Sequence, residues 1–142
     1  ADMGVTMVSL DILYAQSDFI TLHTTVTEES RYMIDAANIA KMKHGVRIIN
    51  AARGVLIRDA DLAEAIRSGK VAGAALDVFE PESPAADNPL IGLPGVIHTP
   101  HLAASTADAQ NNVALDAAQL VIDALTQGRY ANVCNPQALH SK

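Results

Sequence analysis

The chain has 142 residues, a formal net charge of −6 and a hydrophobic fraction of 49%. This length suits one domain with a substantial core, and the acidic balance argues against nucleic acid as a partner. No apolar run approaches the roughly 18 residues that a membrane-spanning helix needs, and we expect neither a signal peptide nor a membrane partner.

Alanine accounts for 25 residues, whereas aromatic residues make up only 4% of the chain. This composition is typical of an α/β protein in which alanine lines the contacts between helices and a sheet. The single cysteine, Cys134, excludes a disulfide within the chain and fits a reducing compartment. We therefore expect a cytoplasmic protein and interpret Cys134 as an ordinary, unreactive thiol.

Short apolar runs alternate with helical patterns along the chain. We predict strands at residues 5–8, 18–23, 46–51, 71–78 and 95–99. We predict helices at residues 10–15, 36–42, 58–68 and 106–127. Such alternation is typical of parallel crossover units in a sheet that is covered by helices.

The last predicted helix has the clearest boundaries. Ser105 is its predicted N-cap, with Asp108 three residues later as the return half of a capping box. Gly128 is its predicted end, because glycine readily adopts the left-handed conformation that terminates helices. Residues 81–94, which precede the last strand, contain four prolines and predict a loop.

Three side chains suited to acid–base chemistry, Arg53, Glu82 and His101, each follow the end of a successive predicted strand. Ligands bind at the carboxyl ends of the strands in open α/β sheets. An arginine can clamp a carboxylate, a histidine can transfer a proton near neutral pH, and a neighbouring carboxylate can keep that histidine protonated. Each residue taken singly has a plainer structural explanation, but their common edge favours reduction of a 2-keto acid or its reverse.

The other four histidines are interpreted as structural. His23 and His98 lie within or at the ends of predicted strands, where they are candidates for the core. His44 and His140 lie among polar neighbours, and we expect both to be exposed.

Four segments together resemble the D-isomer-specific 2-hydroxyacid dehydrogenases, and within that family the D-3-phosphoglycerate dehydrogenases. They are residues 17–24, 49–54, 73–82 and 99–106. The segments occur in the order found in the family, and the likeness extends to Asn135. The resemblance implies an α/β fold with a partial Rossmann-like, doubly wound parallel sheet. The family's first two strands and its glycine-rich loop are absent, since the sequence contains no Gly-x-Gly.

The resemblance also implies roles for individual residues. Arg53 would bind the substrate, His101 would act as the acid and base, and Glu82 would pair with His101. Contacts with the implied cofactor, NAD, would fall on Thr24, Ala51, Ala52, Arg53, Asp77, His101, Ala103 and Ala104. Asp77 would face the nicotinamide, and an aspartate buried among small residues independently favours a role because burial of an unpaired charge is costly. No metal site is implied.

The domain organisation follows from the same resemblance. Residues 1–135 would be the C-terminal part of a dinucleotide-binding domain, and residues 136–142 the start of a segment that returns to the substrate domain. Because the pyrophosphate-binding loop has no counterpart in the chain, we expect the chain alone to be inactive. The strand at 18–23 would form an exposed edge, and residues 1–16 would be displaced or pair with another chain.

The implied function is an oxidoreductase that transfers hydride between NAD and a D-2-hydroxy acid, with 3-phosphoglycerate as the leading substrate. The expected partners are a small 2-hydroxy or 2-keto acid and a second copy of the chain in a homodimer. Three alternatives stay open: a hydroxypyruvate or glyoxylate reductase, a non-enzymatic NAD-sensing module of the corepressor type, and a purely structural or dimerising piece.

Overall fold

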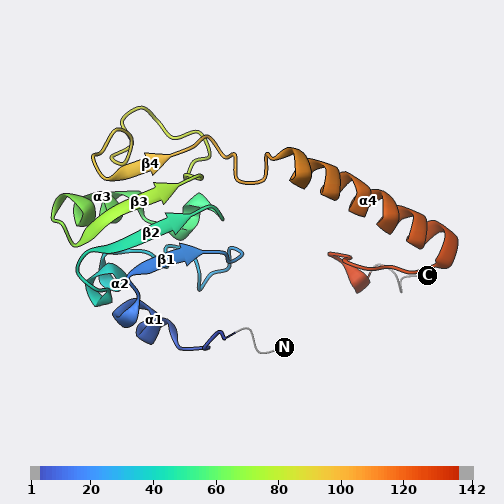
Figure 1. The fold of residues 1–142 in the computed structure, drawn as a ribbon, viewed down its shortest axis with the longest axis horizontal. Helices are drawn as coiled ribbons and strands as arrows, with labels where there is room; N and C mark the ends of the chain where they lie inside the picture. The colour runs from blue at the N-terminus through green and yellow to red at the C-terminus, as the bar shows by residue number, and fades with distance from the viewer. Residues whose placement is uncertain (1–3, 138–142) are drawn as a thin grey trace. The chain divides into compact units, whose positions relative to one another are not determined.

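A four-stranded parallel sheet organises the first part of the chain. In the computed structural model, which describes residues 4–137, the strands are β1 (Phe19–Leu22), β2 (Val46–Asn50), β3 (Val71–Leu76) and β4 (Val96–His98). They lie in that order in space, and each neighbouring pair is parallel (Figure 1). Their carboxyl ends therefore share one edge, and the predicted α/β class is confirmed.

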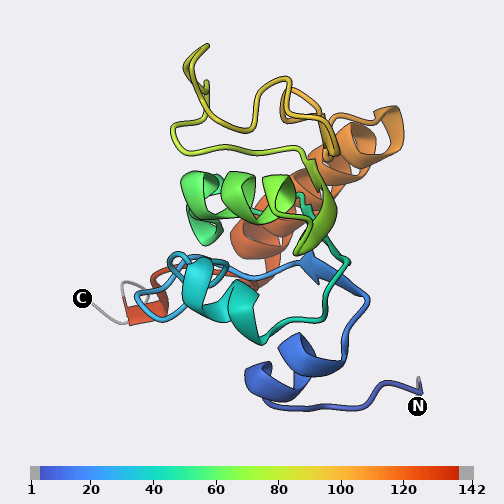
Figure 2. The ribbon, with the colours of Figure 1, turned by 90° about the vertical axis from the view of Figure 1, so that its left-hand side faces the viewer.

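Helices precede and connect the strands. α1 (Leu10–Gln16) precedes β1, α2 (Ala36–Lys41) leads into β2, and α3 (Asp59–Arg67) leads into β3. A short 3₁₀ turn, η1 (Gly54–Leu56), comes before α3 and was not predicted. Figure 2 shows α3, α2 and α1 one after another, and each contacts its neighbour in this row.

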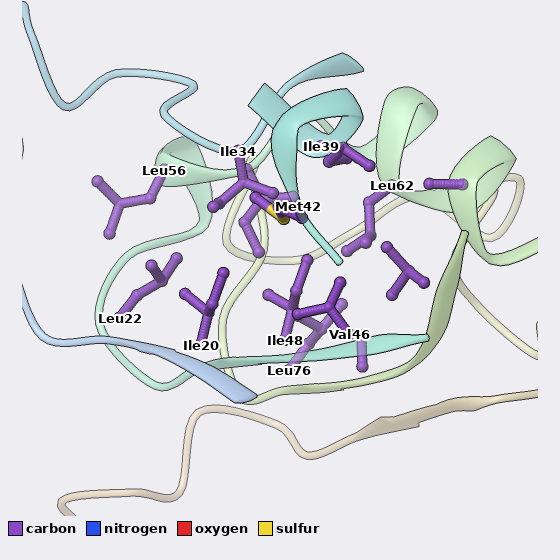
Figure 3. Close-up of a cluster of buried hydrophobic side chains, with 14 of the residues drawn as sticks. Ile20, Leu22, Ile34, Ile39, Met42, Val46, Ile48, Leu56, Leu62 and Leu76 are labelled. Carbon is purple, nitrogen blue, oxygen red and sulfur yellow. The ribbon is translucent and has the colours of Figure 1, made fainter. Parts of the chain in front are cut away.

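The core lies between these helices and one face of the sheet. Alternate strand residues such as Ile20 and Ile48 are buried in one cluster with Ile39 of α2 and Leu62 of α3 (Figure 3). On the opposite face, Phe19 is 63% exposed. Within residues 4–103, helices therefore cover only one face of the sheet.

A second compact unit begins at Ala104 and contains α4 (Ala107–Gln127). The predicted N-cap at Ser105 is wrong by one residue. Thr106 has the extended backbone of a cap, and its hydroxyl accepts a hydrogen bond from the amide of Ala109 (3.1 Å). Gly128 ends the helix with a left-handed φ of 62°, as predicted.

The first residues follow the predictions only in part, since β1 is an exposed edge as expected but the strand at 5–8 is not formed. Residues 5–8 form no strand, because no neighbouring strand offers them hydrogen bonds, and β1 is the edge of the sheet among the described residues. Helix α1, by contrast, is docked rather than displaced: Tyr14 is 2% exposed and donates its hydroxyl to the carbonyl of Met33 (3.0 Å). The expectation of a displaced segment is therefore wrong for α1, and residues 1–3 lie outside the described residues.

Most other boundaries agree to within one or two residues. Each observed strand is shorter than predicted, because pairing stops where the chain turns at the edge of the sheet. Residues 81–94 form a loop as predicted. Across residues 4–137, no helix combines the length and apolar character needed to cross a membrane. The predicted boundary at residue 135 remains a prediction, and most of the segment 136–142, with His140, lies outside the described residues.

Candidate active site

Glu82 and His101 meet in a pocket of about 650 Å³ at the carboxyl edge of the sheet. Glu82 lies in the loop after β3 and His101 in the loop after β4, so neighbouring strands bring the two side chains together. The Nδ1 atom of His101 contacts Oε1 of Glu82. Among the described residues no other group hydrogen-bonds the ring, so Nε2 is available for proton transfer.

Asp77, directly after β3, holds the backbone around His101. Its carboxylate accepts hydrogen bonds from the amides of Leu102 (2.7 Å) and Ala103 (2.8 Å) and from the hydroxyl of Thr99. Its carbonyl oxygen accepts the amide of His101 (3.0 Å). Burial of Asp77 opposes ionisation, but these donors and the positive charge of His101 outweigh burial and lower the pKa of the carboxyl.

The Asp77 bonds also offset backbone strain at His101. This residue has a φ of 56°, in the left-handed region. For a residue with a side chain this conformation costs about 1–2 kcal/mol. Strained conformations persist where the surrounding structure over-determines them, and here several bonds from one aspartate do so.

Arg53 lies in a turn after β2 that is held locally. Asn50, which is 1% exposed, donates from Nδ2 to the carbonyl of Arg53 (2.9 Å) and accepts the amide of Ala52 (3.0 Å). Gly54 packs so closely that an added Cβ would lie 2.0 Å from the carbonyl carbon of Phe79. The exposed guanidinium of Arg53 donates to the carbonyl of Ala52 (2.6 Å). The turn therefore presents a cationic fork at the carboxyl edge.

The candidate residues occupy adjoining pockets rather than one. The first pocket contains His101 and Asp77, and the second, of about 400 Å³, contains Arg53 and Ala51. A third, smaller pocket shares Ala51 with the second and Asp77 with the first. The candidate cofactor residues that line the second pocket are Thr24, Ala51, Ala52 and Arg53. Ala103 contributes its amide to Asp77, and Ala104 belongs to the second unit.

The two histidines named as candidates for the core are both exposed, so neither belongs to the core. His23 lines the Arg53 pocket, with Nε2 2.9 Å from the hydroxyl of Thr21. His98 lines the His101 pocket, and its ring meets that of Phe79 edge-on, 6.1 Å between centroids. The alternation of β1, which buries Ile20 and Leu22, would have placed His23 on the opposite face. His44 is exposed as predicted.

Two polar residues that build the site have no predicted role. Asn50 lies in the predicted strand at 46–51, but asparagine commonly hydrogen-bonds the backbone two residues on, and this is the local signal for its role. Thr99 ends the predicted strand at 95–99, and nothing local indicates its bond to Asp77, 22 residues earlier.

Comparison with known proteins identifies the family. Residues 1–103 match the family described as "D-isomer specific 2-hydroxyacid dehydrogenase, NAD binding domain". The chain belongs to this family. The sheet and the edge that carries Arg53, Glu82 and His101 are thus part of a 2-hydroxyacid dehydrogenase NAD-binding domain.

Several members of the family are similar over most of the chain. A D-3-phosphoglycerate dehydrogenase of Archaeoglobus fulgidus is 49% identical over 121 residues, which is 85% of this chain and 23% of that protein. A hydroxypyruvate reductase of Thermotoga maritima is 45% identical over 126 residues, or 87% of this chain and 41% of the relative. The crystal structure of a glyoxylate reductase from Paecilomyes thermophila has a TM-score of 0.86 at 34% identity. The match covers 96% of this chain and 41% of that chain. The chain thus spans less than half the length of these three relatives.

Proposed function

We propose that the chain supplies the acid–base half of the active site of an NAD-dependent enzyme that interconverts a D-2-hydroxy acid and its 2-keto acid. The observation that carries this proposal is the contact between His101 and Glu82 in a turn held by Asp77. Residues 1–135 would form part of the dinucleotide-binding domain, with the following residues leading to a substrate domain.

In the proposed reaction the three side chains have distinct tasks. The guanidinium of Arg53 binds the substrate carboxylate and orients the keto group. The Nε2 atom of His101 gives a proton to the keto oxygen during reduction and takes one from the hydroxyl during oxidation. The Glu82 carboxylate orients the ring through its contact with Nδ1, which leaves Nε2 facing the substrate. Bound NADH would supply the hydride.

The residues present fit the nicotinamide end of NAD. The pocket beside Arg53 is lined by Thr24 and by the small side chains of Ala51 and Ala52, which leave room for a flat ring. The carboxylate of Asp77 uses three of its roughly four acceptor positions within the protein, which leaves one for a ligand donor. The pyrophosphate would need a segment outside this sequence, which contains no Gly-x-Gly.

We favour 3-phosphoglycerate as the substrate, because a D-3-phosphoglycerate dehydrogenase is 49% identical over 85% of the chain. Reduction of hydroxypyruvate or glyoxylate is the second candidate, because a hydroxypyruvate reductase is 45% identical and a glyoxylate reductase shares the fold at a TM-score of 0.86. We further propose a homodimer in the cytoplasm, in keeping with the free thiol of Cys134.

The test is NADH oxidation by protein expressed from the complete reading frame that encodes this chain. The keto acids compared are 3-phosphohydroxypyruvate, hydroxypyruvate and glyoxylate. His101→Ala should lower kcat by about 10²–10⁴-fold, the usual contribution of a positioned acid or base. Arg53→Ala should chiefly raise KM, since it removes the carboxylate clamp.

His44→Ala and Arg47→Ala are the matched controls, because both side chains are exposed and neither lines a candidate pocket. Unchanged turnover in His101→Ala would refute the proposed role of that histidine. Binding of NADH without turnover of any of the three acids would instead support a sensing module. The preferred keto acid distinguishes the two substrate candidates.

A further inference from the structure

The turn that carries His101 begins at Thr99, whose hydroxyl has no role in the proposed reaction. Thr99 directly follows β4, and its amide donates to the carbonyl of Leu76 at the end of β3 (3.0 Å). Its hydroxyl donates to Oδ1 of Asp77, the next residue along. These two bonds join the carboxyl ends of neighbouring strands where the His101 turn starts.

The rest of the turn closes around the same carboxylate. Because His101 has a left-handed backbone, the amides of Leu102 and Ala103 converge on Asp77, one on each carboxylate oxygen. Successive backbone N–H groups arranged in this way form a concave nest for an anion. Among the described residues, Thr99 is the only one whose side chain donates to Asp77, so it fixes the rotation of the carboxylate within the nest.

We propose that Thr99 is a positioning residue for proton transfer: its hydroxyl orients Asp77, and Asp77 holds His101 in the left-handed conformation that brings Nδ1 to Glu82. The inference rests on the proposed role of His101 as the acid and base. The positioning of Asp77 and His101 by Thr99, however, can be observed without substrate or cofactor, so it can be tested separately from the role of His101.

The test is NMR spectroscopy of the 142-residue chain with Thr99→Val and Thr99→Ser. Valine matches the size of threonine but lacks the hydroxyl. Thr99→Val should speed hydrogen exchange at the Leu102 and Ala103 amides by on the order of tenfold, the effect of losing one hydrogen bond. It should also broaden the Nδ1–H resonance of His101. Thr99→Ser keeps the hydroxyl and should preserve both signals.

Thr126→Val is the matched control, because it also removes a threonine hydroxyl, one that donates to the carbonyl of Ile122 within α4 (2.7 Å). It should leave the His101 turn unchanged. Wild-type exchange and an unchanged His101 resonance in Thr99→Val would overturn the inference, as would loss of both signals in Thr99→Ser. If Thr99→Val does not fold, the hydrogen exchange and the His101 resonance of Thr99→Ser alone test the inference. Absence of NADH oxidation would refute the proposed function without altering these spectra.

Discussion

The two turns at the carboxyl edge are each held by one buried polar residue, but they are built differently. Asn50 holds the Arg53 turn through bonds to residues two and three positions ahead. Asp77 holds the His101 turn through bonds to residues 22 to 26 positions ahead. The first turn is held by a neutral side chain and local contacts, whereas the second needs an ionised side chain and the pairing of β3 with β4.

One backbone hydrogen bond joins the two residues that hold the turns. The amide of Asp77 donates to the carbonyl of Asn50 (2.9 Å), so the two holding residues sit on neighbouring strand ends. Within residues 4–137, no side-chain hydrogen bond joins the network of Asn50 to that of Asp77. We therefore expect the turns to respond separately to substitution, and the following experiments test that separation.

Gly54→Ala should have the largest effect on stability. The added Cβ would lie 2.0 Å from the carbonyl carbon of Phe79 and 2.1 Å from its oxygen, so backbone must move. Overpacking against backbone should cost about 3 kcal/mol or more in the free energy of unfolding. The measurement is the urea midpoint at unchanged slope.

Gly92→Ala is the control for Gly54→Ala. Gly92 has a φ of 73° and nothing within 4 Å of an added Cβ, so the change adds backbone strain without a clash. Its expected cost is about 1–2 kcal/mol. Equal costs for the two substitutions would contradict the close approach of the Arg53 turn to the chain after β3.

Replacing the carboxylate of Asp77 by an amide, or the amide of Asn50 by a carboxylate, should have the next largest effect on the free energy of unfolding. Asp77→Asn places an N–H₂ group opposite the amide of Leu102 or Ala103, and Asn50→Asp places a carboxylate opposite the carbonyl of Arg53. Each leaves a buried group unpaired, at a cost of about 1–3 kcal/mol.

Amide hydrogen exchange shows which turn each of these two substitutions loosens. Asn50→Asp should speed hydrogen exchange at the Ala52 amide, and Asp77→Asn should speed it at whichever of the Leu102 and Ala103 amides then faces the N–H₂ group. Asp116→Asn, an exposed position on α4, is the control and should leave all three amides unchanged. If either substitution speeds hydrogen exchange equally in both turns, the side-chain networks of Asn50 and Asp77 form a single network.

The same contrast explains what the sequence could predict. The apolar run at residues 18–23 and the Gly128 stop are local signals, and both gave correct elements. The strand expected at residues 5–8 failed because β-branched residues favour a strand only where a partner offers hydrogen bonds. Local pattern carries no information on whether that partner is there.

The candidate site divides in the same way. Arg53, Glu82 and His101 were found because each follows a strand, and the parallel order brings those ends to one edge. Asp77 is predicted from the resemblance and from the cost of burying a charge, but its donors, Thr99 and two amides, come from beyond the next strand. Only the registered pairing of β3 with β4 brings them together.

Lowering the pH should also distinguish the two turns, and its effect on stability should be the smallest of those compared. The pKa of Asp77 is lowered on folding, so its ionised form stabilises the fold fully above the ordinary aspartate value of about 3.9. This contribution is lost as the pH falls through the lower folded value. The effect should be smaller than that of Asp77→Asn, because a protonated carboxyl still accepts hydrogen bonds.

The measurement is urea unfolding of the wild-type chain and Asp77→Asn between pH 7 and pH 2.5. Asp123 also titrates in this range, since hydrogen bonds from Arg129 and Gln119 lower its pKa, but both proteins share that contribution. The stability difference between the two proteins should therefore be constant at higher pH and narrow below about pH 4. Exchange at Leu102 and Ala103 should quicken over the same range relative to Ala52, whose partner Asn50 does not titrate. A pH-independent difference would mean that Asp77 holds the His101 turn by shape and hydrogen bonding without its charge, which would remove the contrast between the two turns.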